Sequence, residues 1–266
     1  MTDTSQVVRR DAEPRAAARA HWEPDWIDAF LRCPVCHHRQ LERHPHGIRC
    51  PACQRETSFV DGGVLADPRV GAHAPAAPPP RDDIAGRVRA FYEQHPFPNY
   101  DGFESVGDLL ARASRSVYAA MLDRQIPIGA RVLEVGCGTG QLGLFLSIGG
   151  RAVVGVDLSR ASLRLASRFA DEQGLGDCQF VHASLFDLPL ASDAFDLVIC
   201  KGVLHHTPDP EGGLRAILRV LRPGGYVVCG LYNRLGRIPT TLRRAWFRAT
   251  GRGRGSADVV LRELAR

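Results

Sequence analysis

Two pairs of cysteines near the N-terminus have the spacing of a metal site. Cys33 and Cys36 form one CxxC pair, and after 13 intervening residues Cys50 and Cys53 form a second. A two-residue spacer lets both thiolates of a pair reach one tetrahedral ion at about 2.3 Å, and two pairs complete the closed shell of a structural zinc site. Four buried thiols without a metal are the alternative interpretation. The histidines between the pairs are interpreted as surface residues: His37, His38, His44 and His46.

The second informative group is a run of glycines at alternate positions. Gly136, Gly138 and Gly140 follow a short strand-like run, where glycine lets the chain turn sharply and lets a ligand lie against bare backbone. The helix expected to follow presents its N-terminal amides to a negatively charged group. Asp157 lies 17 residues past Gly140 and ends the next apolar run. From there its carboxylate can accept hydrogen bonds from both hydroxyls of a ribose.

Two cofactor classes fit this pattern. Gly138-x-Gly140-x-x-Gly143 formally matches the dinucleotide motif GxGxxG, and Asp157 would serve NAD equally well. Glu134, however, precedes the first glycine. Its negative charge would repel a pyrophosphate but favour the positive methionine end of S-adenosylmethionine. The sequence therefore favours S-adenosylmethionine.

The sequence beyond this loop resembles a known family. It reads FDLVICKGVLHHTPDP from Phe195 and LRPGG from Leu221. With the glycine loop, these motifs are similar to those of class I S-adenosylmethionine-dependent methyltransferases, particularly bacterial members with a VLHH, DP and LRPGG core. The similarity runs from about residue 131 to about residue 231. It implies a Rossmann-like fold, S-adenosylmethionine as cofactor and methyl transfer as the reaction.

The resemblance also implies which residues border the cofactor. The family usually has an acid after its third strand that receives the adenine amino group, and this chain has Ser184 there, a weaker neutral acceptor. Leu185 and Phe186 could compensate by packing on the adenine, and the exit of the fourth strand, Cys200 to Val203, borders the cofactor. The predicted cofactor-contacting residues are Glu134, Gly136, Gly138, Gly140, Asp157, Ser184, Leu185, Lys201 and Tyr92.

Tyr92 belongs to an aromatic segment, Phe91 to Tyr100, that precedes the predicted sheet. This segment is interpreted either as an anchor for the entry helix or as a lid whose aromatic faces attract the positive sulfonium. His205 and His206 are the candidate catalytic bases. A base is needed only if the acceptor must lose a proton, because positioning supplies much of the rate enhancement. A purely structural role for the two histidines is the alternative.

Elements that could position these residues alternate along the chain. Short apolar runs without polar alternation, separated by helical patterns, predict a parallel sheet covered on both faces, an α/β fold of Rossmann-like type. The expected strands are Arg131–Val135, Arg151–Val156, Gln179–His182, Phe195–Cys200 and Tyr226–Leu231. The expected helices are Gln141–Ser147, a helix capped by Ser159 and running to Glu172, and Glu211–Val220, which ends at Arg222–Gly225.

The domain organisation follows from the same patterns. We expect a polar tail at 1–24, a zinc-ribbon module at 25–70, a Pro/Ala-rich linker at 71–83 and a methyltransferase domain at 84–266 with its core at 131–231. Residues 31–67 resemble the zinc-ribbon activator proteins that partner certain methyltransferases, in which a CPxC pair and a short hairpin precede a VDG turn, here at Val60.

A class I methyltransferase sheet has seven strands, the last two forming an antiparallel hairpin. Five strands are expected by Leu231, and the remaining 35 residues contain helical rather than strand patterns. We therefore expect the C-terminal hairpin to be missing, leaving a sheet edge that is exposed or covered by a helix. The alternative is that N-terminal residues supply the missing strands.

Composition narrows the remaining choices only slightly. The net charge of +5 is mild, and neither a signal peptide nor a long apolar run is evident, so the cytoplasm is the expected compartment and no membrane partner is expected. A small-molecule acceptor is the leading hypothesis. An RNA methyltransferase is the alternative, because ten arginines and no acid lie between Gly212 and Ala257. A non-catalytic binding module is a third possibility, which the intact glycines disfavour. The oligomeric state stays open.

Overall fold

The computed structural model describes residues 26–60, 64–66, 84–102 and 104–231, with positions 238, 239, 242, 243 and 246. Residues up to Cys229 belong to one compact unit and those from Gly230 to a second. The predicted tail, the linker and two residues of the VDG turn lie outside the described residues. In the second unit each described position from Ile238 to Trp246 is helical, within the arginine-rich helix expected from the sequence.

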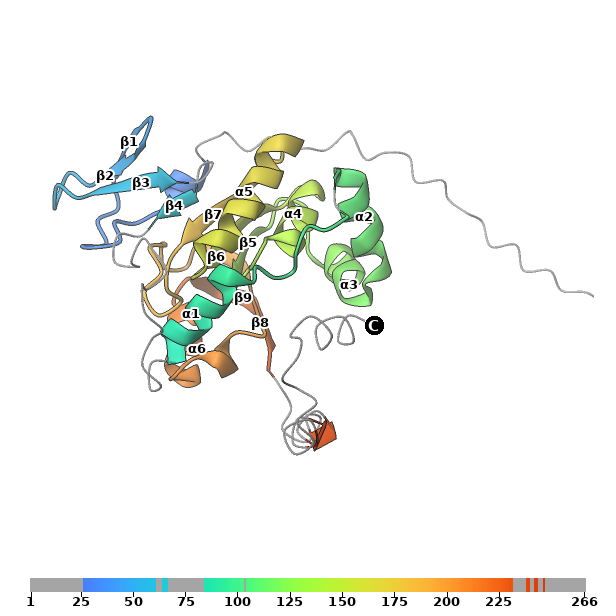
Figure 1. The fold of residues 1–266 in the computed structure, drawn as a ribbon. Helices are drawn as coiled ribbons and strands as arrows, with labels where there is room; N and C mark the ends of the chain where they lie inside the picture. Colours follow the sequence, from blue (N-terminus) through green and yellow to red (C-terminus); the bar gives the residue numbers. More distant parts are fainter. Residues whose placement is uncertain are drawn as a thin grey trace, which may run out of the picture. The chain divides into compact units, whose positions relative to one another are not determined.

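A single sheet organises the first unit (Figure 1). Its strand order is β1-β2-β3-β4-β7-β6-β5-β8-β9, and β6 pairs in parallel with both β5 and β7, as β5 does with β8. The five strands β7-β6-β5-β8-β9 have the 3-2-1-4-5 order of the doubly wound α/β fold, which confirms the predicted fold class. The strands are β1 (Glu42–His44), β2 (Gly47–Arg49), β3 (Glu56–Val60), β4 (Val64–Ala66), β5 (Arg131–Val135), β6 (Ala152–Asp157), β7 (Cys178–His182), β8 (Phe195–Lys201) and β9 (Leu221–Gly230).

Helices cover one face of this sheet with an apolar layer. Leu122 and Leu144 pack with Phe169 from three different helices against the strand residues Val132 and Phe180. The helices are α1 (Ile84–Gln94), α2 (Val106–Arg115), α3 (Val117–Gln125), α4 (Gln141–Ile148), α5 (Arg160–Gln173) and α6 (Pro210–Leu218), with short 3-10 turns η1 (Trp26–Ala29) and η2 (Leu204–His206).

The ends of α5 follow directly from its sequence. The Ser159 side chain accepts a hydrogen bond from the Ser162 amide, and Gly174 ends the helix in a left-handed conformation. Glu93, near the end of α1, accepts two further hydrogen bonds from the first amides of α5. Because an acidic side chain is favourable at a helix N-terminus, Glu93 ties the entry helix to the sheet.

The opposite face of the sheet is covered largely by the N-terminal residues. The connection between β7 and β8, residues 183–194, is fully described and contains no helix. In place of a crossover helix, the buried side chains of Trp26, Ile27 and Leu31 pack in the same core as Val154 and Phe195. β4 also pairs in parallel with β7. The four-cysteine segment is therefore continuous with the parallel sheet.

This arrangement corrects the strand count expected from the sequence. We predicted five strands, whereas the sheet has nine, because the N-terminal residues add β1 to β4 beyond β7. These N-terminal strands join at the edge opposite to β9, so they do not take the place of the C-terminal hairpin, as the alternative interpretation would require. Most of the segment after Leu231, to which the missing-hairpin prediction refers, lies outside the described residues.

The predicted element boundaries agree to within a few residues except at β9. Arg222–Gly225 was expected to end the preceding helix, but α6 ends at Leu218 and these residues lie inside β9. Proline is tolerated in a strand at the edge of a sheet, and β9 is the last strand in the described order. Cys229 is exposed on this strand.

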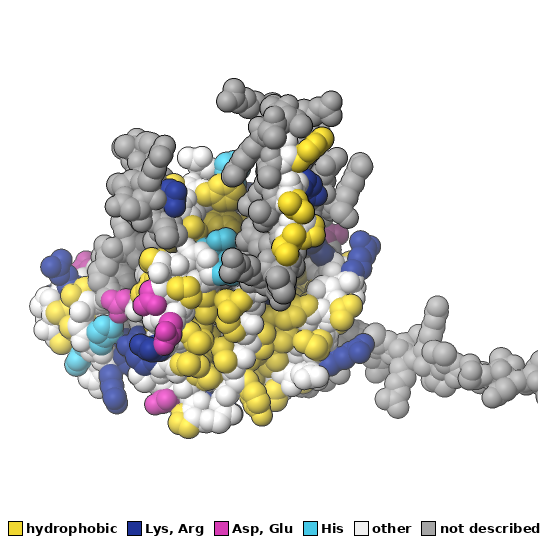
Figure 2. All heavy atoms as spheres, turned by 90° about the horizontal axis from the view of Figure 1, so that it is seen from below, with side chains coloured by type: hydrophobic (Ala, Val, Ile, Leu, Met, Phe, Trp, Pro, Cys, Tyr) yellow, Lys and Arg dark blue, Asp and Glu magenta, His cyan; other side chains and the backbone are white. Residues whose placement is uncertain are grey.

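Apolar side chains reach the surface at several places. Tyr226 on β9 is 76% exposed and Val117 at the start of α3 is 85% exposed. The view from below shows hydrophobic side chains gathered over much of that face (Figure 2). Among the described residues, none of the helices has the length and hydrophobicity that crossing a bilayer requires.

Candidate functional site

The glycine loop lies between β5 and α4, where its backbone meets two other segments. Gly136 has a φ of +71°, and a Cβ atom there would lie 2.1 Å from Cγ2 of Val203, just beyond β8. Gly138 has a φ of +55°, and its Cβ would lie 2.3 Å from the carbonyl oxygen of Phe97. Side chains at either position would push these segments away. The loop therefore needs glycine both for its left-handed backbone and for close packing.

Asp157, at the end of β6, organises this loop. Its Oδ2 accepts a hydrogen bond from the Gly138 amide and its Oδ1 accepts one from the Ser159 amide, both at 2.8 Å. Burial raises the pKa of Asp157 and the two amides oppose that shift. A carboxylate has about four acceptor positions, so these amides do not use all of them. The geometry is compatible with the predicted role of binding ribose hydroxyls.

Glu134, Tyr118 and Lys201 form a polar group near the base of the loop. Oε2 of Glu134 is buried and has no hydrogen-bond partner. Burial raises the pKa of Glu134 to about 8, although the Gly143 amide and the positive charge of Lys201 act to lower it. Nζ of Lys201, the last residue of β8, lies 4.2 Å from the centre of the Tyr118 ring. Tyr118 comes from α3 and was not among the predicted site residues, because no local motif marks it.

The aromatic segment that was predicted as a lid or an anchor contacts the glycine loop. Tyr100 Oη donates to the carbonyl of Thr139 at 2.7 Å, and Gln141 Nε2 donates to the carbonyl of Asn99 at 2.8 Å. The Tyr100 ring stacks on Phe169 with centroids 4.8 Å apart, so this residue is an anchor. Phe97, by contrast, is 70% exposed.

Tyr92 lies at the end of α1 beside α5. Its carbonyl accepts a hydrogen bond from Oγ of Ser159, two residues beyond Asp157. Its ring meets that of Phe91 edge to face, with centroids 5.3 Å apart. The structure thus brings Tyr92 to the same edge of the sheet as Asp157.

Ser184 and Leu185 begin the loop that follows β7. The amide of the preceding residue, Ala183, donates a hydrogen bond to the Asp157 carbonyl at 3.2 Å, which places this loop next to Asp157. Oγ of Ser184 accepts a hydrogen bond from the Phe186 amide. The Leu185 side chain packs against α6, since its Cδ1 lies 2.9 Å from where a Cβ on Gly213 would be.

His205 and His206 form η2 directly after β8. Both are partly buried, and their ring centroids lie 4.2 Å apart. They follow Val203, which packs on Gly136. The two imidazoles therefore lie at the carboxyl end of the sheet, on the same edge as the glycine loop.

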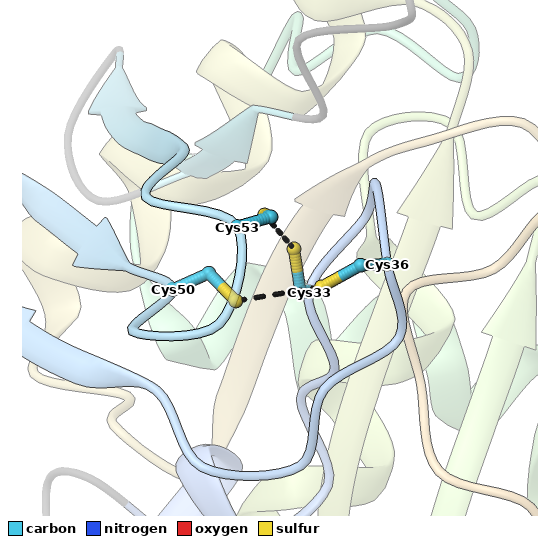
Figure 3. A group of neighbouring side chains, drawn as sticks. All are labelled: Cys33, Cys36, Cys50 and Cys53. Atoms are coloured by element: carbon cyan, nitrogen blue, oxygen red, sulfur yellow. Dashed lines mark hydrogen bonds between the residues drawn. The ribbon is translucent and has the colours of Figure 1, made fainter.

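The four predicted metal ligands converge (Figure 3). All four Sγ atoms lie within 4.8 Å of one another. The Cys33–Cys53 and Cys36–Cys50 sulfur distances are both 3.5 Å, close to the roughly 3.8 Å edge of a tetrahedron of sulfurs around zinc.

The surroundings act differently on the thiols of the cluster: burial raises the pKa of Cys33, and burial with the neighbouring thiols raises that of Cys36 although the His38 amide opposes them. The Val35 amide lies 3.4 Å from Sγ of Cys33. Burial would raise the pKa of Cys50, but hydrogen bonds from the Cys53 amide and the Cys36 thiol outweigh it and lower that pKa to about 7. Four converging cysteine sulfurs are the donor set of a closed tetrahedral site, so the residues present fit zinc.

Comparison with known proteins identifies the same part of the chain. Residues 133–229 match the family described as "Methyltransferase domain". A ubiquinone biosynthesis O-methyltransferase from Paracidovorax citrulli is 41% identical over 107 residues, which are 40% of this chain and 45% of that protein. Another with the same name from Chromobacterium violaceum is 38% identical over 117 residues, 42% of this chain and 49% of that one.

A solved structure, that of the YcgJ protein from Bacillus subtilis, aligns with a TM-score of 0.40 and 28% identity over 42% of this chain and 48% of its own. The chain thus spans less than half the length of the two curated relatives above.

Proposed function

We propose that the chain contains a class I S-adenosylmethionine-dependent methyltransferase domain and that this domain transfers a methyl group to a small-molecule acceptor. The observation that carries the proposal is the glycine loop held by Asp157 beside the end of β8. This arrangement leaves backbone, a carboxylate and an ammonium group at one edge of the sheet. Carboxyl ends of parallel strands are where doubly wound folds bind their ligands.

The proposed binding residues divide by the part of the cofactor they would hold. Asp157 accepts hydrogen bonds from the ribose hydroxyls, and Ser184 and Leu185 border the adenine. Gly136, Gly138 and Gly140 supply bare backbone and the N-terminal end of α4 for the methionine carboxylate. Lys201 adds a positive charge for the same carboxylate, and Glu134 accepts from the methionine ammonium group. Tyr92 faces the sulfonium side.

S-adenosylmethionine, when bound, supplies the methyl group and leaves as a neutral thioether. The residues of this chain hold the acceptor in line and exclude water, which is where most of the rate enhancement of such a transfer arises. If the acceptor atom is a hydroxyl oxygen, its proton must leave as the carbon–oxygen bond forms. We propose that His205 or His206 accepts this proton as a general base, because they are the first titratable residues that follow β8 in the chain.

A small-molecule acceptor is supported by the names of the relatives. Both similar proteins described above are called ubiquinone biosynthesis O-methyltransferases. The experiment is incubation of the purified chain with labelled S-adenosylmethionine and two acceptor pools, small phenolic metabolites and bulk RNA. Label in the small-molecule fraction, located by mass spectrometry, supports the proposal. Label only in RNA supports the arginine-rich alternative, and no label with either pool contradicts the proposed activity.

We also propose that Cys33, Cys36, Cys50 and Cys53 hold one structural zinc ion. A closed shell of four thiolates leaves no position for substrate, so the ion would stabilise the fold and take no part in methyl transfer. Elemental analysis of the full chain should find one zinc per molecule. It should find none in Cys33→Ala/Cys36→Ala, and a full complement of zinc in that variant would contradict the assignment.

A further inference from the structure

The four-cysteine cluster is linked to both ends of the loop that follows β7. The first link starts at Leu31, two residues before Cys33. Leu31 forms an antiparallel bridge with Leu190, in which the Arg32 amide donates to the carbonyl of Pro189 at 2.9 Å. The Ala191 amide donates in turn to the carbonyl of Phe30 at 2.7 Å. Leu31 and Leu190 are 1% and 2% exposed, so the bridge is also fixed by packing.

The second link starts at the other cysteine pair. Cys50 and Cys53 lie in the turn between β2 and β3, which pair from Gly47 to Arg49. β3 pairs with β4, and β4 pairs with the last residues of β7 at Val181 and His182. Ala183 follows immediately. The second cysteine pair is therefore connected through two strands to the start of the same loop.

Metal binding would join these two links into a closed ring. Without the ion, the two cysteine pairs are held together by the β1–β2 segment between them and by the apolar core that Leu31, Ile48 and Leu65 share. With the ion, both ends of residues 183–191 are fixed relative to each other. Ser184 and Leu185 lie within this loop, beside Asp157.

We propose that the four-cysteine site positions the loop Ala183–Ala191, and that zinc binding thereby sets the affinity of the adenine side of the cofactor site. The inference rests on the proposed function for the identity of the ligand. It assigns the ribbon a role in cofactor binding although none of its residues touches the cofactor.

The test compares Cys53→Ala with Cys229→Ala in the full chain. Both remove one thiol, but Cys229 is exposed on β9 and takes no part in either site. Two probes are titrated by calorimetry: S-adenosylhomocysteine, and methylthioadenosine, which lacks the amino-acid part. Cys53→Ala should lower the affinity for both probes by the same factor, at least about fivefold. The two losses should be equal because the displaced loop contacts the adenosine part, which both probes share. Cys229→Ala should bind both as the wild type does.

Two further measurements keep the result decisive. Hydrogen exchange without cofactor should show faster exchange in residues 183–191 of Cys53→Ala, while β5 and α4 keep their protection. Cys53→His, which retains a zinc ligand, should restore both properties. If Cys53→Ala does not fold, Arg32→Pro removes the amide that donates to Pro189 and leaves all four thiols, and it should give the same changes.

The outcomes separate this inference from the proposed function. A wild-type chain that binds neither probe contradicts the proposed function, and the exchange data then decide the role of the ribbon alone. A zinc-free Cys53→Ala that binds both probes within twofold of the wild type, with unchanged exchange in 183–191, would overturn the inference. So would a loss confined to S-adenosylhomocysteine, because it would place the effect on the amino-acid side.

Discussion

Asp157 has two roles that use the same carboxylate. It accepts hydrogen bonds from the Gly138 and Ser159 amides. In the proposed function it also accepts hydrogen bonds from the ribose hydroxyls. Asp157→Ala should weaken S-adenosylmethionine binding about tenfold or more, since a hydrogen bond to a charged group is worth roughly 1.5–3 kcal/mol. Calorimetry measures this loss, with Asp171→Ala on the exposed side of α5 as the control. Equal affinity in Asp157→Ala and the wild type would refute the assignment.

Lys201 should discriminate between the two halves of the cofactor. Its ammonium group lies over Tyr118 at the end of β8, on the side where the methionine carboxylate is proposed to bind. Lys201→Met keeps the apolar stem and removes the charge. It should weaken the binding of S-adenosylhomocysteine about fivefold or more and leave the affinity for methylthioadenosine unchanged. The reason is that a hydrogen bond to a charged group is lost only for the first ligand. An equal loss for both ligands would show that Lys201 acts on the loop structure instead.

At the scale of elements, Asp196 joins three strands of the sheet. Its carboxylate on β8 accepts from the backbone and guanidinium of Arg131 on β5 and from Nε of Arg222 on β9. The hydrogen bonds from Arg131, with a further one from Arg222, lower the pKa of Asp196 to about 2. Because the folded pKa is below the ordinary value near 3.9, the stabilisation is complete above about pH 4 and is lost as the pH falls towards 2.

Asp196→Asn should therefore destabilise the chain in a pH-dependent way. The expected loss is about 1–2 kcal/mol at pH 7, reduced from the full pKa difference because the side chain is partly exposed. Urea unfolding at pH 7 and at pH 3 measures it, and the difference from the wild type should shrink at the lower pH. Glu211→Gln, which removes an exposed ion pair with Arg215 within α6, should change stability little at either pH. A pH-independent loss in Asp196→Asn would contradict this account.

At the scale of the whole molecule, the N-terminal segment is part of the catalytic core. Five of its side chains are buried in the core that it shares with the catalytic sheet: Trp26, Ile27, Leu31, Ile48 and Leu65. At roughly 1.5–3 kcal/mol for each buried side chain, their loss is comparable with the whole stability of a typical domain. The N-terminal segment and the sheet are therefore expected to unfold together.

A chain consisting of residues 71–266 should fail to fold cooperatively. Circular dichroism melting against the full chain tests this, with hydrogen exchange of the β5 to β8 strands as a second probe of folding. A cooperative transition at the temperature of the full chain would show that the sheet is stable without its N-terminal cover.

The sequence by itself determined the two chemical motifs and the parallel core. Alternating glycines after an apolar run and two CxxC pairs are local patterns, because a left-handed turn and a metal knuckle each need only a few neighbouring residues. The apolar runs of β5 to β8 were predicted for the same reason, since strands buried on both faces lack polar alternation.

Only the tertiary structure decided what covers the second sheet face and which distant residues meet. The pairing of β4 with β7 and the bridge between Leu31 and Leu190 join segments more than a hundred residues apart. Tyr118 likewise reaches Lys201 only because α3 packs beside the glycine loop. Such contacts are set by which apolar surfaces remain uncovered once the local elements have formed. In this chain the missing helix between β7 and β8 left room that Trp26, Ile27 and Leu31 fill.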